Sequence, residues 1–487
     1  MAFLRAHHVA FSLPTSGPFS LPPTGQPAPL PPAKMPSSIL RPFNIPDSVY
    51  AGALDIRVPL TIATVYAVTA TALSVYNRSR NKRPWAISKT RAFFAFVILH
   101  NVFLALYSAW TFWGMLGVMR RSFRHPMGPG GWPAFFDGAC RLHGPGRLGS
   151  SLYFNEGLGR WSSADAAALG EALEGSLPSR APMGRIWNEG LSYYGWIFYL
   201  SKFYEVLDTF IILAKGKPSS TLQTYHHAGA MMCMWAGMRY MSAPIWMFAL
   251  VNALIHALMY SYYTLTAFHV KVSMTIKRTL TTLQITQFLL GATFATAHLF
   301  VTYLAPVTIT RQGGSDMAAS AADSTIPVAS GVFDSVKQLL FGPALEEGSP
   351  AVTVSPALHS PLLTETVYVA QPCIVTRGEA FAVWLNTLYL APLTYLFVSF
   401  FIASYVKRSK AGSKPSRRES NVTMAEKAGW DAARGVGKVV YGSDNGSNSP
   451  VSPVSPASPA SPASPVSPVA TKSSSPKRSG GRARRRA

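Results

Sequence analysis

The chain has 487 residues, of which 48% are hydrophobic and 13% are charged, and its formal net charge is +23. That charged fraction is about half of the roughly 25% that soluble domains carry, which argues against a chain solvated by water alone. From residue 407 to the end, 16 Lys and Arg stand against 4 Asp and Glu, so about half of the net charge lies in the C-terminal tail. No basic and aromatic platform accompanies this charge, and we therefore expect no nucleic-acid partner.

The two ends of the chain differ in composition from its middle. Residues 1–56 are proline-rich, and residues 452–469 repeat Ser-Pro. Such compositions do not bury enough apolar surface to form a core. We expect a mostly disordered N-terminal arm over 1–56, a membrane domain over 57–406, and a disordered, basic, cytosolic tail over 407–487.

Seven apolar segments follow one another in the middle of the chain. Each is close to the roughly 20 residues that a helix needs to cross a bilayer, and such lengths favour helices over barrel strands. We therefore expect an all-α fold, a polytopic membrane protein with seven transmembrane helices. The segments are residues 58–76, 92–119, 193–214, 221–238, 243–263, 280–304 and 381–406.

Basic residues in the short loops predict the orientation of the helices. Lys and Arg follow the first, third, fifth and seventh segments, whereas the loop between the fourth and fifth holds only Arg239. Because short cytosolic loops are enriched in Lys and Arg, we expect a luminal N-terminus and a cytosolic C-terminus. The loops 120–192 and 305–380 then face the lumen, and we expect the second to be weakly ordered. Cys140 and Cys373 lie in these two loops and can pair if both face an oxidising lumen.

Ionisable side chains inside the third segment are expensive, at roughly 2.5–3.5 kcal/mol each at a helix centre. Lys202, Glu205 and Asp208 are spaced by three, which places them within about 120° of one another on a helix and allows Lys202 and Glu205 to pair. Two interpretations are open. The three residues form a polar wall of an internal cavity, or they are charges solvated at a helix end.

The fifth segment carries a polar stripe on one helical face. Its members are Asn252, His256, Tyr260 and Tyr263. Asn252 can orient the His256 ring by a hydrogen bond, although such a pair can also serve only to join helices. In the sixth segment, Gln284 and Gln287 repeat by three, and hydrogen bonding between helices is the simpler interpretation there.

The fourth segment holds adjacent histidines, His226 and His227, whose side chains point about 100° apart on a helix. One can therefore carry chemistry while the other orients or packs. Gln223 and Cys233 share the side of His226, and a membrane Cys is usually a small apolar filler. A zinc ion on His226, His227 and His256 is conceivable, but few carboxylates accompany the histidines, and we expect no metal.

These motifs, in this order, resemble the very-long-chain fatty acid elongases, the membrane 3-ketoacyl-CoA synthases of the endoplasmic reticulum. "LHN" (99–101) and residues 385–401 also resemble family segments, and the resemblance covers roughly 57–406. In the family, the histidine motif usually reads His-x-x-His-His, whereas here Gln223 occupies the first position. This difference indicates that the residue at the first position orients its neighbours and does not need to titrate. The four motifs are "KFYEVLDT" (202–209), "QTYHH" (223–227), "NALIHALMYSYY" (252–263) and "TTLQITQF" (281–288).

The resemblance implies a decarboxylative condensation, the first step of the elongation cycle, in which a long-chain acyl-CoA and malonyl-CoA give 3-oxoacyl-CoA, CO2 and CoA. It implies that His226 carries the acyl group and that His256, held by Asn252, assists. His227 would be structural or a second polar contact. The polar chamber would be formed by Lys202, Glu205, Asp208, Gln223, Tyr260, Tyr263, Gln284 and Gln287.

The resemblance also implies an acyl-chain tunnel enclosed by the seven helices, cytosolic Lys and Arg that hold the CoA phosphates, and no cofactor. The implied partners are the lipid bilayer and the reductases and dehydratase of the cycle, and a homodimer is allowed. The alternative is a seven-helix transporter or receptor that uses the same polar residues to bind a ligand or protons. A membrane desaturase would need more histidines than the segments hold.

Overall fold

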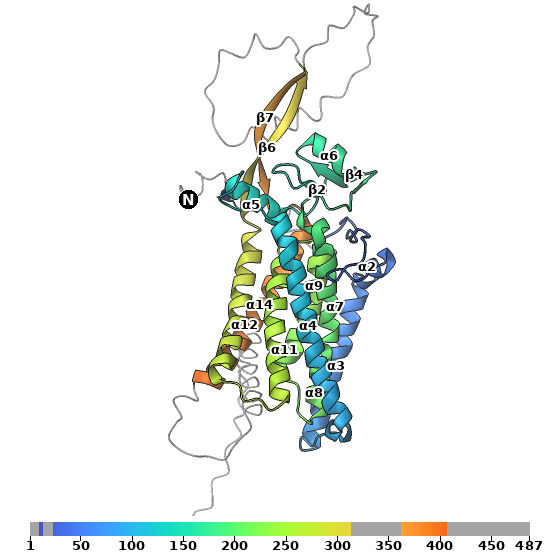
Figure 1. Ribbon diagram of the computed structural model, residues 1–487, viewed down its shortest axis with the longest axis vertical. Helices are drawn as coiled ribbons and strands as arrows, with labels where there is room; N and C mark the ends of the chain where they lie inside the picture. Colours follow the sequence, from blue (N-terminus) through green and yellow to red (C-terminus); the bar gives the residue numbers. More distant parts are fainter. Residues whose placement is uncertain (1–8, 13–22, 313–361, 407–487) are drawn as a thin grey trace, which may run out of the picture. The chain divides into compact units, whose positions relative to one another are not determined.

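The computed structural model describes residues 9–12, 23–312 and 362–406, all of which belong to one compact unit, Met1–Val440. Long helices run side by side, and short helices and strands gather at one end of them (Figure 1). The predicted tail over 407–487 and the loop residues 313–361 lie outside the described residues.

Helix is present in each of the seven predicted segments. The third segment is split into two helices, and the fifth contains a π-helical turn. In chain order, the elements are α3 (Arg57–Ser79), α4 (Arg91–Ser122), α7 (Ser192–Tyr204), α8 (Val206–Ala214), α9 (Thr221–Arg239), α10 (Ile245–Met247), η4 (Phe248–Asn252), α11 (Ala253–Ala267), α12 (Met274–Ala297), α14 (Arg377–Phe401) and η6 (Ile402–Val406).

Within the described ranges, four helices are long and apolar enough to cross a membrane by length and composition. They are α3, α4, the continuous segment Ile245–Ala267, and α14 continued to Ser404. The third segment is split at Glu205 into α7 with 13 residues and α8 with 9, each too short to span a bilayer alone. α9 and α12 carry His, Gln and Thr among their apolar residues. The chain therefore has a helical membrane fold, while the number of seven spans stays a prediction.

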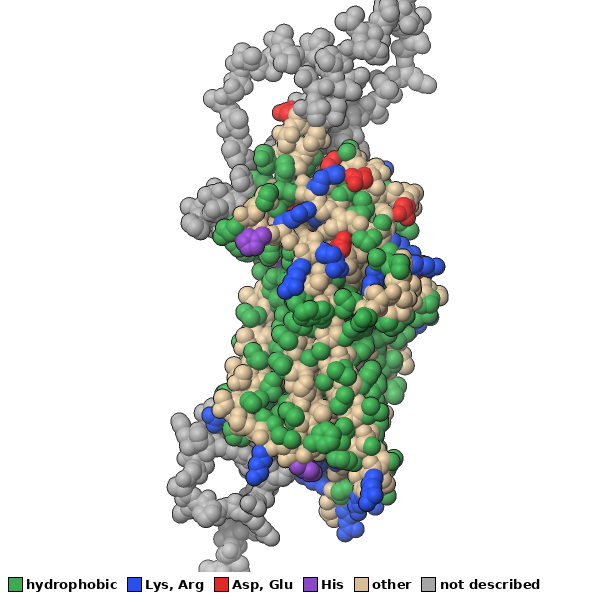
Figure 2. All heavy atoms as spheres, in the orientation of Figure 1, with side chains coloured by type: hydrophobic (Ala, Val, Ile, Leu, Met, Phe, Trp, Pro, Cys, Tyr) green, Lys and Arg blue, Asp and Glu red, His purple; other side chains and the backbone are tan. Residues whose placement is uncertain are grey.

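The outer surface of the helices is apolar. Figure 2 shows hydrophobic side chains over their middle part and Lys and Arg toward both ends. Large apolar side chains are exposed there, including Leu60, Val68, Leu99, Leu106 and Leu289. Soluble monomers rarely expose apolar surface of this extent, so lipid is the solvent that matches these helices.

A cap lies at one end of the helices (Figure 1). We define it as residues 131–178 together with the sheet β1–β6–β7. Residues 131–178 contain two short antiparallel strand pairs, β2–β3 and β4–β5, and Trp187–Leu191 (η3) then leads into α7. The elements of residues 131–178 are α5 (Gly131–Cys140), β2 (Leu152–Asn155), β3 (Arg160–Ser163), α6 (Ala166–Ala172), β4 (Leu173–Glu174) and β5 (Leu177–Pro178).

The loop between the last two segments forms a sheet over its described part, so the expectation of weak order and of an all-α fold is wrong there. β6 (Val301–Gln312) and β7 (Leu362–Pro372) pair antiparallel, and β1 (Val9–Phe11) adds to the start of β6. The sixth helix ends at Ala297 and does not reach residue 304 as predicted. β6 and β7 are rich in Val and Thr, residue types that favour a pleated strand over a helix.

The proline-rich arm is ordered over residues 23–56, contrary to the expectation of disorder. It contains α2 (Asp47–Ala53), whose Tyr50 is fully buried and stacks on Trp196 with ring centroids 5.9 Å apart. Buried donors of the helices satisfy its carbonyl groups, and this holds an arm that cannot form a core alone. The bonds run from Trp187 Nε1 to Leu30 O (2.9 Å), from Tyr199 OH to Ala53 O (2.8 Å), and from Trp235 Nε1 to Leu54 O (2.8 Å).

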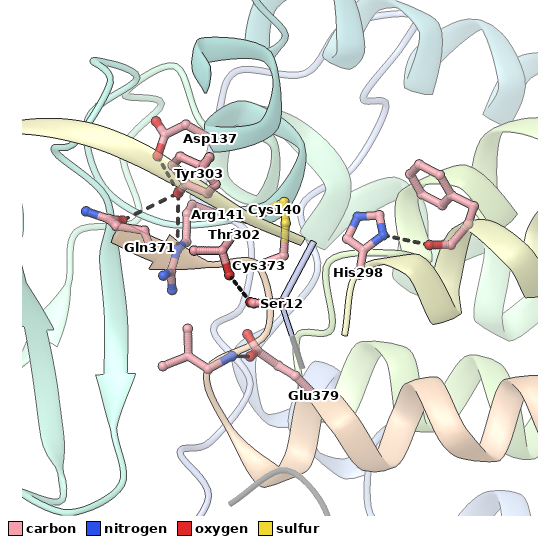
Figure 3. The surroundings of a disulfide bond; sticks show 12 residues. Ser12, Asp137, Cys140, Arg141, His298, Thr302, Tyr303, Gln371, Cys373 and Glu379 are labelled. Carbon is pink, nitrogen blue, oxygen red and sulfur yellow. Dashed lines mark hydrogen bonds between the residues drawn. A yellow bond between two sulfur atoms is a disulfide. The ribbon is translucent and has the colours of Figure 1, made fainter. Parts of the chain in front are cut away.

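Cys140 and Cys373 form a disulfide, the pairing that the sequence left open. Both residues are buried. Cys140 ends α5, and Cys373 directly follows β7 and precedes α14 by four residues. The bond therefore ties the cap to the start of the last helix (Figure 3).

Candidate functional site

A cavity among the helices brings four of the predicted site residues together. Side chains from five different chain segments line it, and most of the lining is apolar. The polar members are Lys202 on α7, His226 on α9, Asn252 at the end of η4, Gln287 on α12, and Asn386 and Tyr389 on α14.

The apolar lining lies on the cap side of the polar lining on four of these segments. The start of α7 and the end of α9 are near the cap (Figure 1). Phe198 accordingly precedes Lys202, and Ala230, Cys233 and Met234 follow His226. Likewise, Met247, Phe248 and Val251 precede Asn252, and Phe288 follows Gln287. On α14, which starts at the cap, the order is reversed, because Leu390 and Leu393 follow Asn386 and Tyr389. The polar side chains thus form a band across the cavity, with most of the apolar lining on its cap side.

The cavity has a volume of about 60 Å³, well below the roughly 300–1,000 Å³ of pockets that enclose an organic ligand. An acyl chain would enter only if side chains of the apolar lining moved aside. The acyl-chain tunnel implied by the resemblance therefore stays a prediction.

Lys202 and Glu205 form a buried ion pair where α7 gives way to α8. Lys202 Nζ donates to Glu205 Oε1 at 2.7 Å and to Asn252 Oδ1 at 3.2 Å. The two charged side chains are only 4% and 1% exposed, which rules out solvation at a helix end for this pair. Burial of two charges is tolerated only when they are closely paired and hydrogen-bonded, and the Asn252 amide completes the pairing.

His256 lies beside Glu205, and no hydrogen bond joins it to Asn252 in the described part of the chain, so the expectation that Asn252 orients it is wrong. His256 Nδ1 is 3.4 Å from Glu205 Oε1, without hydrogen-bond geometry. The Asn252 oxygen accepts from Lys202, and its nitrogen donates to Gln287 Oε1 at 3.4 Å. Spacing put Asn252 and His256 on one face, but the neighbouring helices supply closer partners.

The adjacent histidines have different surroundings, and Gln223 contacts the second of them. His226 lines the cavity, and its backbone oxygen accepts from Tyr389 OH at 2.9 Å. Gln223 Nε2 lies 2.8 Å from His227 Nε2, although the sequence placed Gln223 on the side of His226. On a helix, the side chain of a residue can contact the residues three and four positions further along. Gln223 contacts His227, four positions on, rather than His226, three positions on.

Asp208 belongs to a second polar cluster, one helical turn beyond Glu205. Its two carboxylate oxygens accept from Tyr260 OH at 2.5 Å and from His100 Nε2 at 2.8 Å. His100 lies on α4 and stacks on Tyr204 at 5.3 Å. Sequence reasoning did not place His100 in the site, although a histidine inside an apolar span requires a polar partner, and that requirement is the signal that could have found it.

Tyr263 lies at the edge of the second cluster, with its ring centroid 5.9 Å from that of Tyr260, and it is 40% exposed. Gln284 lies outside both clusters and donates to the Met259 sulfur at 3.3 Å. Tyr389, by contrast, was missed and lies against the histidine turn of α9. Gly229 makes room for it, because a Cβ at that glycine would lie 2.2 Å from the Tyr389 ring.

In the part of the chain that the structure describes, no group of three or more His, Cys, Asp or Glu side chains is placed to hold a metal ion. The polar residues of the cavity instead bind one another. Their arrangement can stabilise an anion at Lys202 and can present the His226 ring to a ligand in the cavity.

The apolar helices and the cavity among them place this chain in the class of helical membrane proteins with a binding site between the helices. The family model described as the GNS1/SUR4 family, ELO, matches residues 53–413. The match covers most of the chain, and the chain belongs to this family.

Curated relatives match a shorter region. Very long chain fatty acid elongase 3 of Homo sapiens is 33% identical over 105 residues, which are 22% of this chain and 39% of the relative. Fatty acid elongase sre1 of Dictyostelium discoideum is 37% identical over 114 residues, 23% and 40% of the two chains. Very long chain fatty acid elongase 4 of Mus musculus is 40% identical over 98 residues, 19% and 31%. The chain thus matches at most 40% of the length of these relatives.

Proposed function

We propose that this chain is a fatty acid elongase, a very-long-chain 3-oxoacyl-CoA synthase that condenses a long-chain acyl-CoA with malonyl-CoA. The observation that carries the proposal is the cavity in which His226, Lys202 and Asn252 adjoin an apolar extension. Membership of the family and relatives named as fatty acid elongases support it. The alternative of a transporter or receptor gains no support from these relatives.

In the first step, a ring nitrogen of His226 attacks the thioester carbonyl carbon of the acyl-CoA. A C–N bond forms as the C–S bond breaks, and the CoA thiolate leaves with the proton that the ring releases. The product is an acyl-imidazole. Apolar side chains such as Phe198, Met234 and Phe248 line the same cavity, and the exclusion of water protects this intermediate from hydrolysis.

In the second step, malonyl-CoA loses CO2, and the electron pair of the broken C–C bond forms an enolate. The enolate carbon attacks the acyl carbonyl, the C–N bond breaks, and His226 takes up a proton, so the two steps together consume one proton. The Lys202 ammonium lines the cavity and would stabilise the developing negative charge. Glu205 holds Lys202, and His256 assists at the thioester carbonyl or during the malonyl attack.

We further propose the endoplasmic reticulum membrane as the location, with the cap in the lumen. A disulfide is stable in that oxidising compartment, and the basic loops lie at the other end of the helices. There, Asn77 Nδ2 donates to Leu213 O and Lys217 O, so the loop after α3 is held against the loop after α8. The Lys and Arg of these loops would bind CoA phosphates, condensation needs no redox cofactor, and reductases and a dehydratase would act next.

Purified protein supplied with long-chain acyl-CoA and labelled malonyl-CoA tests the proposal. We expect labelled 3-oxoacyl-CoA from the wild type and none above background from His226→Ala. The matched control is His269→Asn, because His269 is an exposed loop residue with φ 61° and Asn tolerates that conformation. No product from the wild type with any acyl-CoA would remove the enzyme assignment, and wild-type turnover by His226→Ala would remove the nucleophile.

A further inference from the structure

The cap holds a buried cation that has no close ion-pair partner among the described residues. Arg141, the residue after α5, is 4% exposed. Its Nε donates to Tyr303 OH at 3.4 Å, and its guanidinium lies over the Tyr153 ring at 5.2 Å from the centroid. Among the described residues, its two Nη groups donate no hydrogen bond, and the guanidinium has no carboxylate within ion-pair distance.

Two carboxylates near Arg141 are committed to other groups. Asp137 accepts from Tyr303 OH at 2.7 Å (Figure 3). It also accepts from Arg185 Nη2 at 2.7 Å. Glu379 uses Oε2 to accept from the backbone N–H groups of Val375 and Thr376, at 2.8 and 3.0 Å, and so caps the start of α14. A buried charge is costly when it lacks a close partner, so Arg141 has unused capacity for an anion.

Arg141 lines a cavity between the cap and the ends of the helices, where such an anion can lie. Aromatic side chains form much of the wall, namely Tyr153, Phe154, Trp161 and Tyr240. Glu379, whose Oε2 makes the capping contacts, also lines the cavity. His143 lines it as well, is buried, and has an Nδ1 without a hydrogen-bond partner in the described part of the chain. The volume of about 30 Å³ limits the occupant to a small molecule.

We propose that this cap cavity binds a small organic carboxylate. The carboxylate oxygens would accept from the Nη groups of Arg141, because a guanidinium matches a carboxylate with two parallel hydrogen bonds. The short carbon body would pack on the aromatic wall, which a halide would leave unfilled. The site is separate from the proposed catalytic cavity, since the two share no lining residue.

Thermal unfolding of the purified full-length protein tests the site, with acetate and propionate as probes and chloride used to hold the ionic strength constant. We expect a saturable rise in Tm of at least about 2 °C with either carboxylate, because a ligand that binds only the folded state stabilises it. Arg141→Gln should lose the rise. Arg147→Gln is the matched control and should keep it, because Arg147 is exposed and pairs with Glu171 at 3.0 Å.

A second readout uses the wild-type fold, in case Arg141→Gln does not fold. Trp161 lines the cavity, so acetate and propionate should change tryptophan emission saturably, and Trp161→Phe should remove that change. The proposal is overturned by any of three results. These are no saturable response in the wild type, an equal response in Arg141→Gln, or a response to chloride as large as that to the carboxylates.

Discussion

Gln223 Nε2 donates to His227 Nε2 across 2.8 Å, one turn along α9. With the amide in this orientation, His227 carries its proton on Nδ1, a nitrogen that has no hydrogen-bond partner among the described residues. Gln223 therefore fixes the tautomer and the orientation of the ring beside His226, and the first position of the histidine motif does not need a group that titrates.

Substitution of Gln223 tests this role. Gln223→Leu removes the donor and should lower kcat/KM by about ten- to a hundredfold, because one lost hydrogen bond to a buried group costs about 1–3 kcal/mol. Gln223→His can still donate and should stay within about tenfold of the wild type. Steady-state kinetics with one acyl-CoA decide between the two, and undiminished activity of Gln223→Leu would contradict the role.

The buried pair of Lys202 and Glu205 should be important for stability. Lys202→Met leaves the Glu205 carboxylate buried without its counter-ion, which should lower the free energy of unfolding by about 3–5 kcal/mol. Adding Glu205→Gln to Lys202→Met should recover part of this loss. Denaturation in detergent micelles measures both variants.

The control for that measurement is Arg147→Met in the cap, which breaks an exposed ion pair with Glu171. Exposed pairs contribute about 0–1 kcal/mol. Equal stability of Lys202→Met and Arg147→Met would show that the Lys202 pair is not buried as described.

The disulfide of Cys140 and Cys373 should stabilise the cap on the last helix. Cys140→Ser should lower the free energy of unfolding by about 2–5 kcal/mol, and a reductant should abolish the difference between this variant and the wild type. Cys233→Ser should remain sensitive to reductant, because Cys233 is a free cysteine. Peptide mapping without reductant should recover the Cys140–Cys373 cross-link, and two free thiols there would contradict the pairing.

His143 should make the cap sensitive to acid. Burial, with the nearby Arg185 charge, lowers the pKa of His143 from 6.5 to about 3. The unfolded chain then binds a proton between pH 6.5 and about 3 while the folded chain does not, so this residue lowers stability as the pH falls below 6.5 and has no effect above it. At pH 5 the loss should be about 2 kcal/mol.

Comparison with His143→Phe isolates this contribution from other titrating groups. The His143 ring lies edge-on to Trp161 at 5.0 Å and tilted to Trp187 at 5.6 Å, contacts that a phenyl ring can keep. The variant should gain stability relative to the wild type on going from pH 7 to pH 5. A constant difference between the two proteins across that range would contradict a buried, neutral His143.

Much of the fold could be predicted because a long apolar segment of the sequence is enough to indicate a membrane helix. The segment predicted over 58–76 is helical over Arg57–Ser79, and that over 92–119 over Arg91–Ser122. The cap could not be predicted in this way, since β6 pairs with β7 between residues that lie from 50 positions apart (Gln312 and Leu362) to 70 positions apart (Thr302 and Pro372), and periodicity reports only local structure. The arm was misjudged for the same reason, because the donors that hold it, such as Trp235, are distant in sequence.

The site shows the same division between local and distant contacts. Spacing along one helix predicted the pairing of Lys202 with Glu205, and it placed Cys233 on the side of His226, where both line one cavity. It failed for His100 and Asp208, which lie 108 positions apart on different helices. Spacing says which residues share a face, whereas helix packing decides which partner each residue on that face meets.

Capture of the acyl-enzyme tests the central claim most directly. Purified protein incubated with labelled acyl-CoA in the absence of malonyl-CoA, and then digested, should yield one labelled peptide with the acyl group on His226. Addition of malonyl-CoA before digestion should transfer that label to 3-oxoacyl-CoA. A label on another residue such as Cys233, or no covalent label while condensation proceeds, would contradict the account.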